Sequence, residues 1–158
     1  MGWYYMQITN GNSSLSGGFF ILPAKRIDKM ILLSYHKEKG GVCVAEIIFY
    51  MDKNGNEPIP QYMRELAAKT DKDSRIKLNK ILEYIEILAE HGTRVGVPYV
   101  KHLEGDIWEL RPGNVRILFT LLPNGYVLLH NFIKKTQKTP RREIDKAKKE
   151  IAELMSDI

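Results

Sequence analysis

The spacing of apolar residues changes near Pro98 from a helical to a strand period, and that change restricts the folds open to this chain. Apolar side chains between residues 78 and 89 recur every three or four positions, which is the spacing of one buried helix face. Between residues 108 and 121 apolar and polar side chains alternate instead, which is the period of a β-strand. Helices followed by a run of strands predict an α+β domain.

Residues that favour helix ends mark three helices. We expect one helix from Pro58, a long one from Thr70 to Gly92, and a last one from Thr139. The two threonine hydroxyls are expected to cap the amides of the first turn, and glycine is favoured just beyond a helix end. The predicted strands are residues 44–50, 99–103, 108–111, 115–121 and 126–133. Together they predict an antiparallel sheet of four to five strands, with a two-helix hairpin packed on it and a C-terminal helix.

The first 41 residues differ from the remainder. Asn10-Gly11 and Ser16-Gly17-Gly18 favour loops, and the apolar pieces between them are too short to show a period. We therefore expect a poorly structured leader over residues 1–41 and one folded domain over residues 42–158. The single cysteine, Cys43, has no partner for an internal disulfide. With no apolar run long enough to cross a membrane, we expect a cytoplasmic protein.

The net charge of +5 is concentrated in one segment. Residues 99–142 carry 8 basic and 3 acidic side chains, whereas the segments on either side of it, residues 42–98 and 143–158, are slightly acidic. A basic segment between acidic ones predicts a site for polyanions, and a solvated charged face is the alternative interpretation.

Two arginines in the predicted strands are candidates for binding phosphate. Alternation points Arg111 and Arg116 away from their apolar neighbours, so both are expected on one polar face of the sheet. A guanidinium group donates two parallel hydrogen bonds, which suits a phosphate. The alternative is that Arg111 merely pairs with Glu109 or Glu104.

A basic turn precedes the last helix. Arg141 and Arg142 fall in the first helical turn, where positive charge opposes the helix dipole at a cost of up to about 1 kcal/mol. Because no local structural reason explains this placement, we predict a phosphate site here, and a solvated turn is the competing interpretation. The basic residues of the turn are Lys134, Lys135, Lys138, Arg141 and Arg142.

Other kinds of chemistry find no support in the sequence. The histidines lack the spacing of metal ligands, and there is no glycine-rich phosphate loop or nucleophile elbow. We therefore expect neither a metal nor a cofactor. His130 could transfer protons near neutral pH, but a buried structural histidine is at least as compatible with its apolar strand. His102 presents the same two alternatives.

Three blocks of this sequence follow one another in a specific order. They are DKNGNEP at residues 52–58, then KHL, IWELRP and RILF between residues 101 and 119, and KKTQKTPRREI at residues 134–144. In this order the blocks resemble HigB-type toxins of the RelE superfamily. The resemblance covers roughly residues 44–155. It implies a compact RelE-like fold and a toxin of a type II toxin–antitoxin pair that cleaves messenger RNA in the ribosomal A site, inhibiting translation without a metal.

The resemblance also assigns roles to individual residues. In this reaction the RNA 2′-hydroxyl attacks the adjacent phosphate, so the protein must orient the nucleotide, stabilise charge and move protons. Arg116 aligns with the family's arginine, and Arg111 is a second candidate for the same task. His130 or Lys135 would act as acid or base. Lys101 and the remaining basic residues of the turn would hold the RNA.

The expected partners follow from the same resemblance. They are a helix-turn-helix antitoxin, messenger RNA and the ribosome, with operator DNA touched only through the antitoxin complex. The alternative is a non-catalytic basic module that binds RNA or ribosomes. A DNA-binding regulator ranks last, because strands rather than a helix-turn-helix precede the basic turn.

Overall fold

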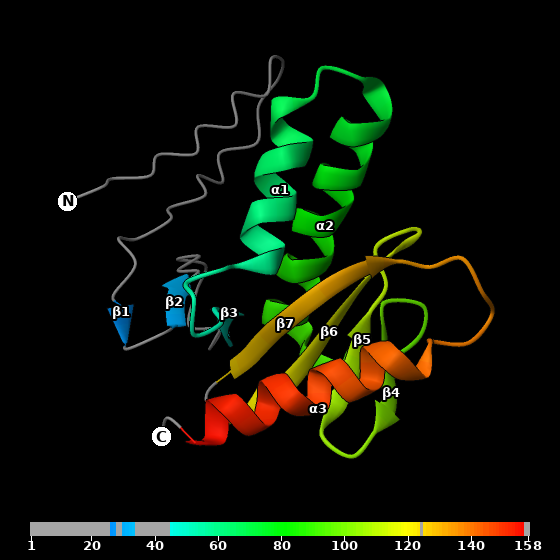
Figure 1. Cartoon of the computed structure of the whole chain (residues 1–158). Coiled ribbons are helices and arrows are strands. Elements are labelled where there is room, and N and C mark those ends of the chain that lie inside the picture. Colours follow the sequence, from blue (N-terminus) through cyan, green and yellow to red (C-terminus); the bar gives the residue numbers. More distant parts are fainter. Residues whose placement is uncertain (1–25, 28–29, 34–44, 124, 157–158) are drawn as a thin grey trace, which may run out of the picture.

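A computed structural model describes residues 26–27, 30–33, 45–123 and 125–156 of the chain. Its helices and strands form an α+β domain around one mixed sheet (Figure 1). The helices are α1 (Pro58–Ala68), α2 (Lys72–His91), a short 3-10 helix η1 (Gly92–Val95) and α3 (Arg141–Ser156). The strands are β1 (Arg26–Ile27), β2 (Met30–Leu33), β3 (Glu46–Tyr50), β4 (Val100–Glu104), β5 (Ile107–Leu110), β6 (Val115–Leu122) and β7 (Gly125–Ile133).

The seven strands lie in the order β1-β2-β3-β7-β6-β5-β4. Strands β4 to β7 form the expected antiparallel meander, whereas β3 pairs parallel with β7. A parallel neighbour needs a long crossover connection, and here α1, α2 and the meander lie between the two strands. The α+β fold class with a helical pair and a C-terminal helix is thus confirmed. The sheet is mixed, whereas the sequence predicted an antiparallel one.

Capping explains where the helices begin and end. Pro58 occupies the first turn of α1, as expected. The cap of α2 is Asp71, whose carboxylate accepts from the amide of Ser74 at 2.8 Å, so the prediction that Thr70 caps this helix was wrong by one residue. Gly92 ends α2 at a φ of 65°, and a side chain there would collide with the Tyr126 hydroxyl. Only glycine fits this position without strain.

Helices cover both faces of the sheet (Figure 1). The α1–α2 pair buries one core, which includes Ile81, Leu88 and Phe119. On the other face α3 packs over Leu118 and Leu129. The face expected to be polar is therefore largely a second core, because the returning C-terminal helix shields it from water.

A β-bulge changes which side chains of β7 face α3. Leu118 pairs with His130, but Phe119 pairs with Leu128, so Leu129 is an extra residue on β7. A bulge of this kind disturbs the strict alternation of a strand. Both Leu129 and His130 consequently lie on the α3 side, which a simple period of two does not predict.

The leader expected over residues 1–41 lies mostly outside the described residues. Its two described pieces are β1 and β2, and β2 pairs antiparallel with β3 at the edge of the sheet. The division of the chain at residue 42 stays a prediction.

Candidate functional site

A buried carboxylate holds the two strand arginines together. Glu109 on β5 is 1% exposed, and its Oε1 lies 3.4 Å from Nε of Arg111 and 3.5 Å from Nε of Arg116. Its Oε2 accepts a hydrogen bond from the Thr139 hydroxyl. Thr139 was expected to cap α3, but this helix begins at Arg141, and the Thr139 hydroxyl instead ties its start to the arginine pair through Glu109. The pairing of Arg111 with Glu109 is therefore real, and it brings both arginines to one place.

Arg116 is anchored by its own backbone neighbourhood. One terminal nitrogen, Nη1, donates to the carbonyls of Gly113 and Val115, both at 2.7 Å. Burial lowers the pKa of Arg116, and the charge of Glu109 opposes that shift. An arginine titrates so far above neutrality that the group remains a cation. The side chain is thus a rigid, partly desolvated charge, which interacts more strongly with an anion than a solvated charge does.

Both arginines line a pocket of about 240 Å³ at the end of the sheet. Lys80 and Tyr84 of α2 form one side of it, and Pro98 and Gly113 complete the lining. Within the described part of the chain, the terminal nitrogens of Arg111 and Nη2 of Arg116 have no protein acceptor. The pocket therefore combines several cations with donors that a bound anion can use.

Two further lysines lie near this pocket. Partial burial and then the charge of Arg116 lower the pKa of Lys134, with Arg111 and Lys101 acting in the same direction. The backbone amide of Lys134 donates to Asn114 at 2.9 Å, which holds the end of β7 beside the start of β6. The structure thus brings together four of the predicted residues: Arg111, Arg116, Lys101 and Lys134.

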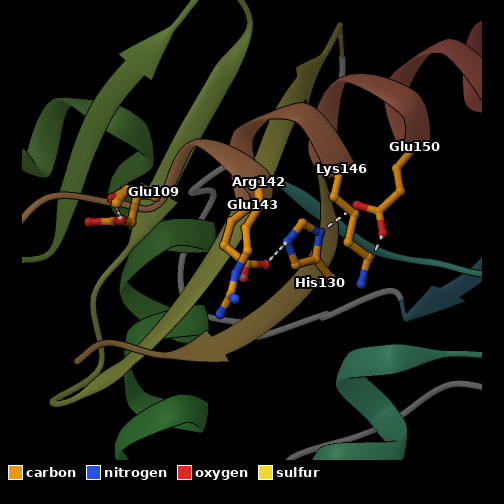
Figure 2. A network of polar contacts seen from close by, with 7 residues as sticks. Glu109, His130, Arg142, Glu143, Lys146 and Glu150 are labelled. Atoms are coloured by element: carbon orange, nitrogen blue, oxygen red, sulfur yellow. Dashed lines mark hydrogen bonds and ion pairs between the residues drawn. The ribbon is translucent and has the colours of Figure 1, made fainter. Parts of the chain in front are cut away.

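His130 lies elsewhere, beneath α3. The ring is 1% exposed, and its Nδ1 donates to Oε2 of Glu150 at 2.6 Å. Its Nε2 lies 3.3 Å from Oε2 of Glu143 on the same helix. Figure 2 shows the imidazole between these two carboxylates, with Glu109 in a separate group. The structure does not bring His130 to the pocket.

The remaining basic residues are exposed around the turn before α3. Lys135 and Lys138 are exposed in the connection from β7 to α3. Arg141 pairs with Glu104 and Asp145, and Lys148 binds the same Glu104 carboxylate. These ion pairs give Arg141 the structural reason that the sequence did not reveal. Arg142, the most exposed of these arginines, pairs with Glu143.

Sequence reasoning missed the contribution of α2 to the site. Lys80 and Tyr84 are four residues apart and therefore share one helix face, but nothing in the sequence indicates that this face meets the strand arginines. Glu109 was considered only as a pairing partner. Its position two residues before Arg111 was the available signal, since alternate strand residues lie on one face.

The arrangement can bind and neutralise a phosphate group. Its cations, Lys80, Lys101, Arg111, Arg116 and Lys134, lie in or near the pocket, and Glu109 pairs with the two arginines. In the ranges described, no three His, Cys, Asp or Glu side chains are grouped as metal ligands would be. None of the described helices has the length and apolar character needed to cross a membrane.

The fold and the pocket thus define a small α+β protein with a cationic pocket beside its sheet. A family model of phage-derived Gp49-like proteins (DUF891) matches residues 61–152, more than half of the chain, so the chain belongs to the Gp49-like family. This family stands among the RelE/HigB-like toxins, which places the chain with the toxins of toxin–antitoxin systems and implies an antitoxin partner. The chain matches none of the curated proteins compared with it.

Proposed function

We propose that this protein is a HigB-type toxin of a type II toxin–antitoxin pair, and that it cleaves messenger RNA on the ribosome without a metal. The observation that supports this most is the pair Arg111 and Arg116, held by one buried carboxylate at a pocket with spare donors. The family match supports the toxin class. A helix-turn-helix antitoxin would hold the toxin inactive.

The proposed reaction needs charge stabilisation more than any other contribution. The 2′-oxygen bonds to phosphorus and the 5′-oxygen leaves, which produces a 2′,3′-cyclic phosphate and a free 5′-hydroxyl. Arg116 and Arg111 would neutralise the negative charge that grows on the phosphorane oxygens. Lys101 and Lys134 would hold the neighbouring backbone phosphates, with Lys138, Arg141 and Arg142 extending the basic surface.

Proton transfer requires a base for the 2′-hydroxyl and an acid for the leaving 5′-oxygen. Of the two candidates from the sequence, Lys135 is exposed beside Lys134, whereas His130 is enclosed under α3. We therefore propose Lys135 for proton transfer and a structural role for His130.

Growth measurements test the function directly. Expression of the full chain without its antitoxin should arrest growth, and mapping of 5′ ends should show cleaved messages. Arg116→Ala should relieve the arrest, because it removes the buried charge at the pocket. Arg75→Ala, an exposed arginine on α2, is the matched control and should remain toxic. A folded Arg116→Ala protein as toxic as the unchanged chain would contradict the proposal.

A non-catalytic module that binds RNA or ribosomes is the second candidate. It is favoured by one observation, namely that the residues described as lining the pocket include two arginines, one lysine and a tyrosine but no histidine. Such a module would bind ribosomes or RNA in a translating extract and leave the messages intact. Site-specific cleavage in that extract would exclude it.

A further inference from the structure

The α2 side of the pocket differs chemically from the strand side. Arg111 and Arg116 supply positive charge from the strand side, whereas Tyr84 of α2 supplies an aromatic ring and Lys80 of the same helix a further cation. A site for inorganic phosphate alone needs only the cations. An aromatic ring next to them is typical of sites where a nucleotide binds through both its phosphate and its base.

Tyr84 is held in place from behind. Its ring packs against Tyr99 with centroids 5.0 Å apart and planes inclined at 52°. Tyr99 is itself tied to the arginine pair, because its carbonyl accepts the backbone amide of Arg111 at 2.9 Å. The tyrosine is therefore fixed relative to the guanidinium groups, and little side-chain freedom would be lost when a ligand binds.

The tyrosine also remains neutral at the pH of a cell. Burial, followed by the neighbouring Tyr99, raises the pKa of Tyr84, and the charges of Arg116 and Arg111 only partly oppose this. A neutral phenol does not repel a phosphate, and its π-face attracts any nucleobase irrespective of its identity.

We propose that the pocket is a single-nucleotide subsite, in which Arg111 and Arg116 bind the phosphate while a base stacks on Tyr84. The volume of about 240 Å³ is smaller than the roughly 300–1,000 Å³ of clefts that enclose drug-sized ligands, so the pocket would hold the phosphate and the stacked base while the rest of the strand stays outside. Lys80, on the same lining, would contact a second phosphate of the strand. This inference rests on the proposed function and adds a base-binding residue to it.

The experiment compares a ligand with a base to one without. The full chain is titrated with adenosine 3′,5′-bisphosphate and with inorganic phosphate at low ionic strength, and binding is followed by NMR. The bisphosphate should bind more tightly than phosphate. Tyr84→Leu should weaken bisphosphate binding roughly 5-fold or more, since stacking on an aromatic side chain contributes this much per base, and should leave phosphate binding unchanged.

Tyr84→Phe is the matched control, because it keeps the aromatic face and removes only the hydroxyl. It should bind the bisphosphate within about 2-fold of the unchanged protein, by the stacking argument above. Equal losses for both ligands in Tyr84→Leu, no loss for either, or no binding of the bisphosphate would overturn the inference. Base-dependent binding by a chain that neither arrests growth nor cleaves RNA would uphold the subsite and reject the proposed toxin activity.

Discussion

At the scale of single residues, the site depends on a carboxylate that is nearly inaccessible to solvent. Two guanidinium groups within 3.5 Å of Glu109 would repel one another without it. The same residue accepts a hydrogen bond from Thr139 across 30 positions of sequence. Glu109 is thus a positioning residue, which acts on any bound anion through the arginines.

We expect Glu109→Gln to destabilise the protein by about 3 kcal/mol, since breaking a buried ion pair leaves an uncompensated charge. Urea unfolding at neutral pH would measure this loss. Glu83→Gln, which alters an exposed carboxylate on α2, is the control and should change little. An unfolding free energy for Glu109→Gln equal to that of the unchanged protein would show that the carboxylate does not hold the arginines.

At the scale of elements, the start of α2 links stability to pH. The amide of Ser74 is the largest cause that lowers the pKa of Asp71, the cap of this helix. In the turn before α1, the side chain of Asn56 lowers the pKa of Asp52 in the same way. A lowered folded pKa means that the carboxylate stabilises the fold above its unfolded pKa of about 3.9. That stabilisation is lost as the pH falls through the folded value.

The variant Asp71→Ala should therefore lower the melting temperature at pH 7, and the difference from the unchanged protein should shrink as the pH falls below about 4. Thermal unfolding followed by circular dichroism at several pH values would reveal the trend. Asp73→Ala changes a first-turn acid of α2 without removing the cap and should have a smaller effect. A difference that stays constant with pH would mean that the charge of Asp71 plays no part.

The contact between β7 and α3 provides a second test at this scale. Because His130 lies between Glu143 and Glu150, His130→Leu should cost about 3 kcal/mol and reduce amide protection in α3 measured by hydrogen exchange. The double variant His130→Leu with Glu150→Leu should recover much of that loss, since well-packed apolar side chains can replace a buried polar pair.

The same double variant separates a structural histidine from a proton-transferring one. If His130 only holds α3, the stable double variant should still arrest growth as the unchanged chain does. A stable double variant without toxicity would return His130 to the list of reacting groups and contradict its structural assignment.

At the scale of the whole molecule, positive charge gathers at one end of the sheet although the net charge is only +5. This charge comes from Lys101 on β4, Arg111 just after β5, Arg116 on β6 and Lys134 just after β7. In addition to partial burial, the charges of the first three all lower the pKa of Lys134. Elsewhere basic side chains are paired with carboxylates, as Arg141 and Lys148 are with Glu104. The distribution of charge, more than its total, would direct the proposed RNA substrate to the pocket.

We expect the binding of single-stranded RNA to weaken steeply with salt. About four phosphate contacts predict a slope of about −3 in a plot of log K against log salt concentration. Fluorescence anisotropy with a short oligomer would measure it, and Lys134→Gln should make the slope shallower by about 0.7. A slope near zero would contradict phosphate binding by this cluster.

Much of the fold could be predicted from the sequence because the signals are local. The stripe that includes Leu78, Ile81 and Leu88 predicted α2, and Gly92 marked its end. Alternation predicted the meander, and the basic segment was visible from charge alone. Arg111 and Arg116 were placed together correctly, because two adjacent antiparallel strands bring their ends to one edge.

Contacts between distant segments could not be predicted in this way. The bulge at Leu129 turned His130 toward α3, and the packing of the helical pair brought Tyr84 to the arginines. Sequence alone therefore determined which segments are helices and strands and where the cations lie along the chain, since periodicity, capping and charge act over a few residues. Only the tertiary structure decided which cations share a pocket and which are neutralised, because burial and ion pairing depend on neighbours far away in the sequence.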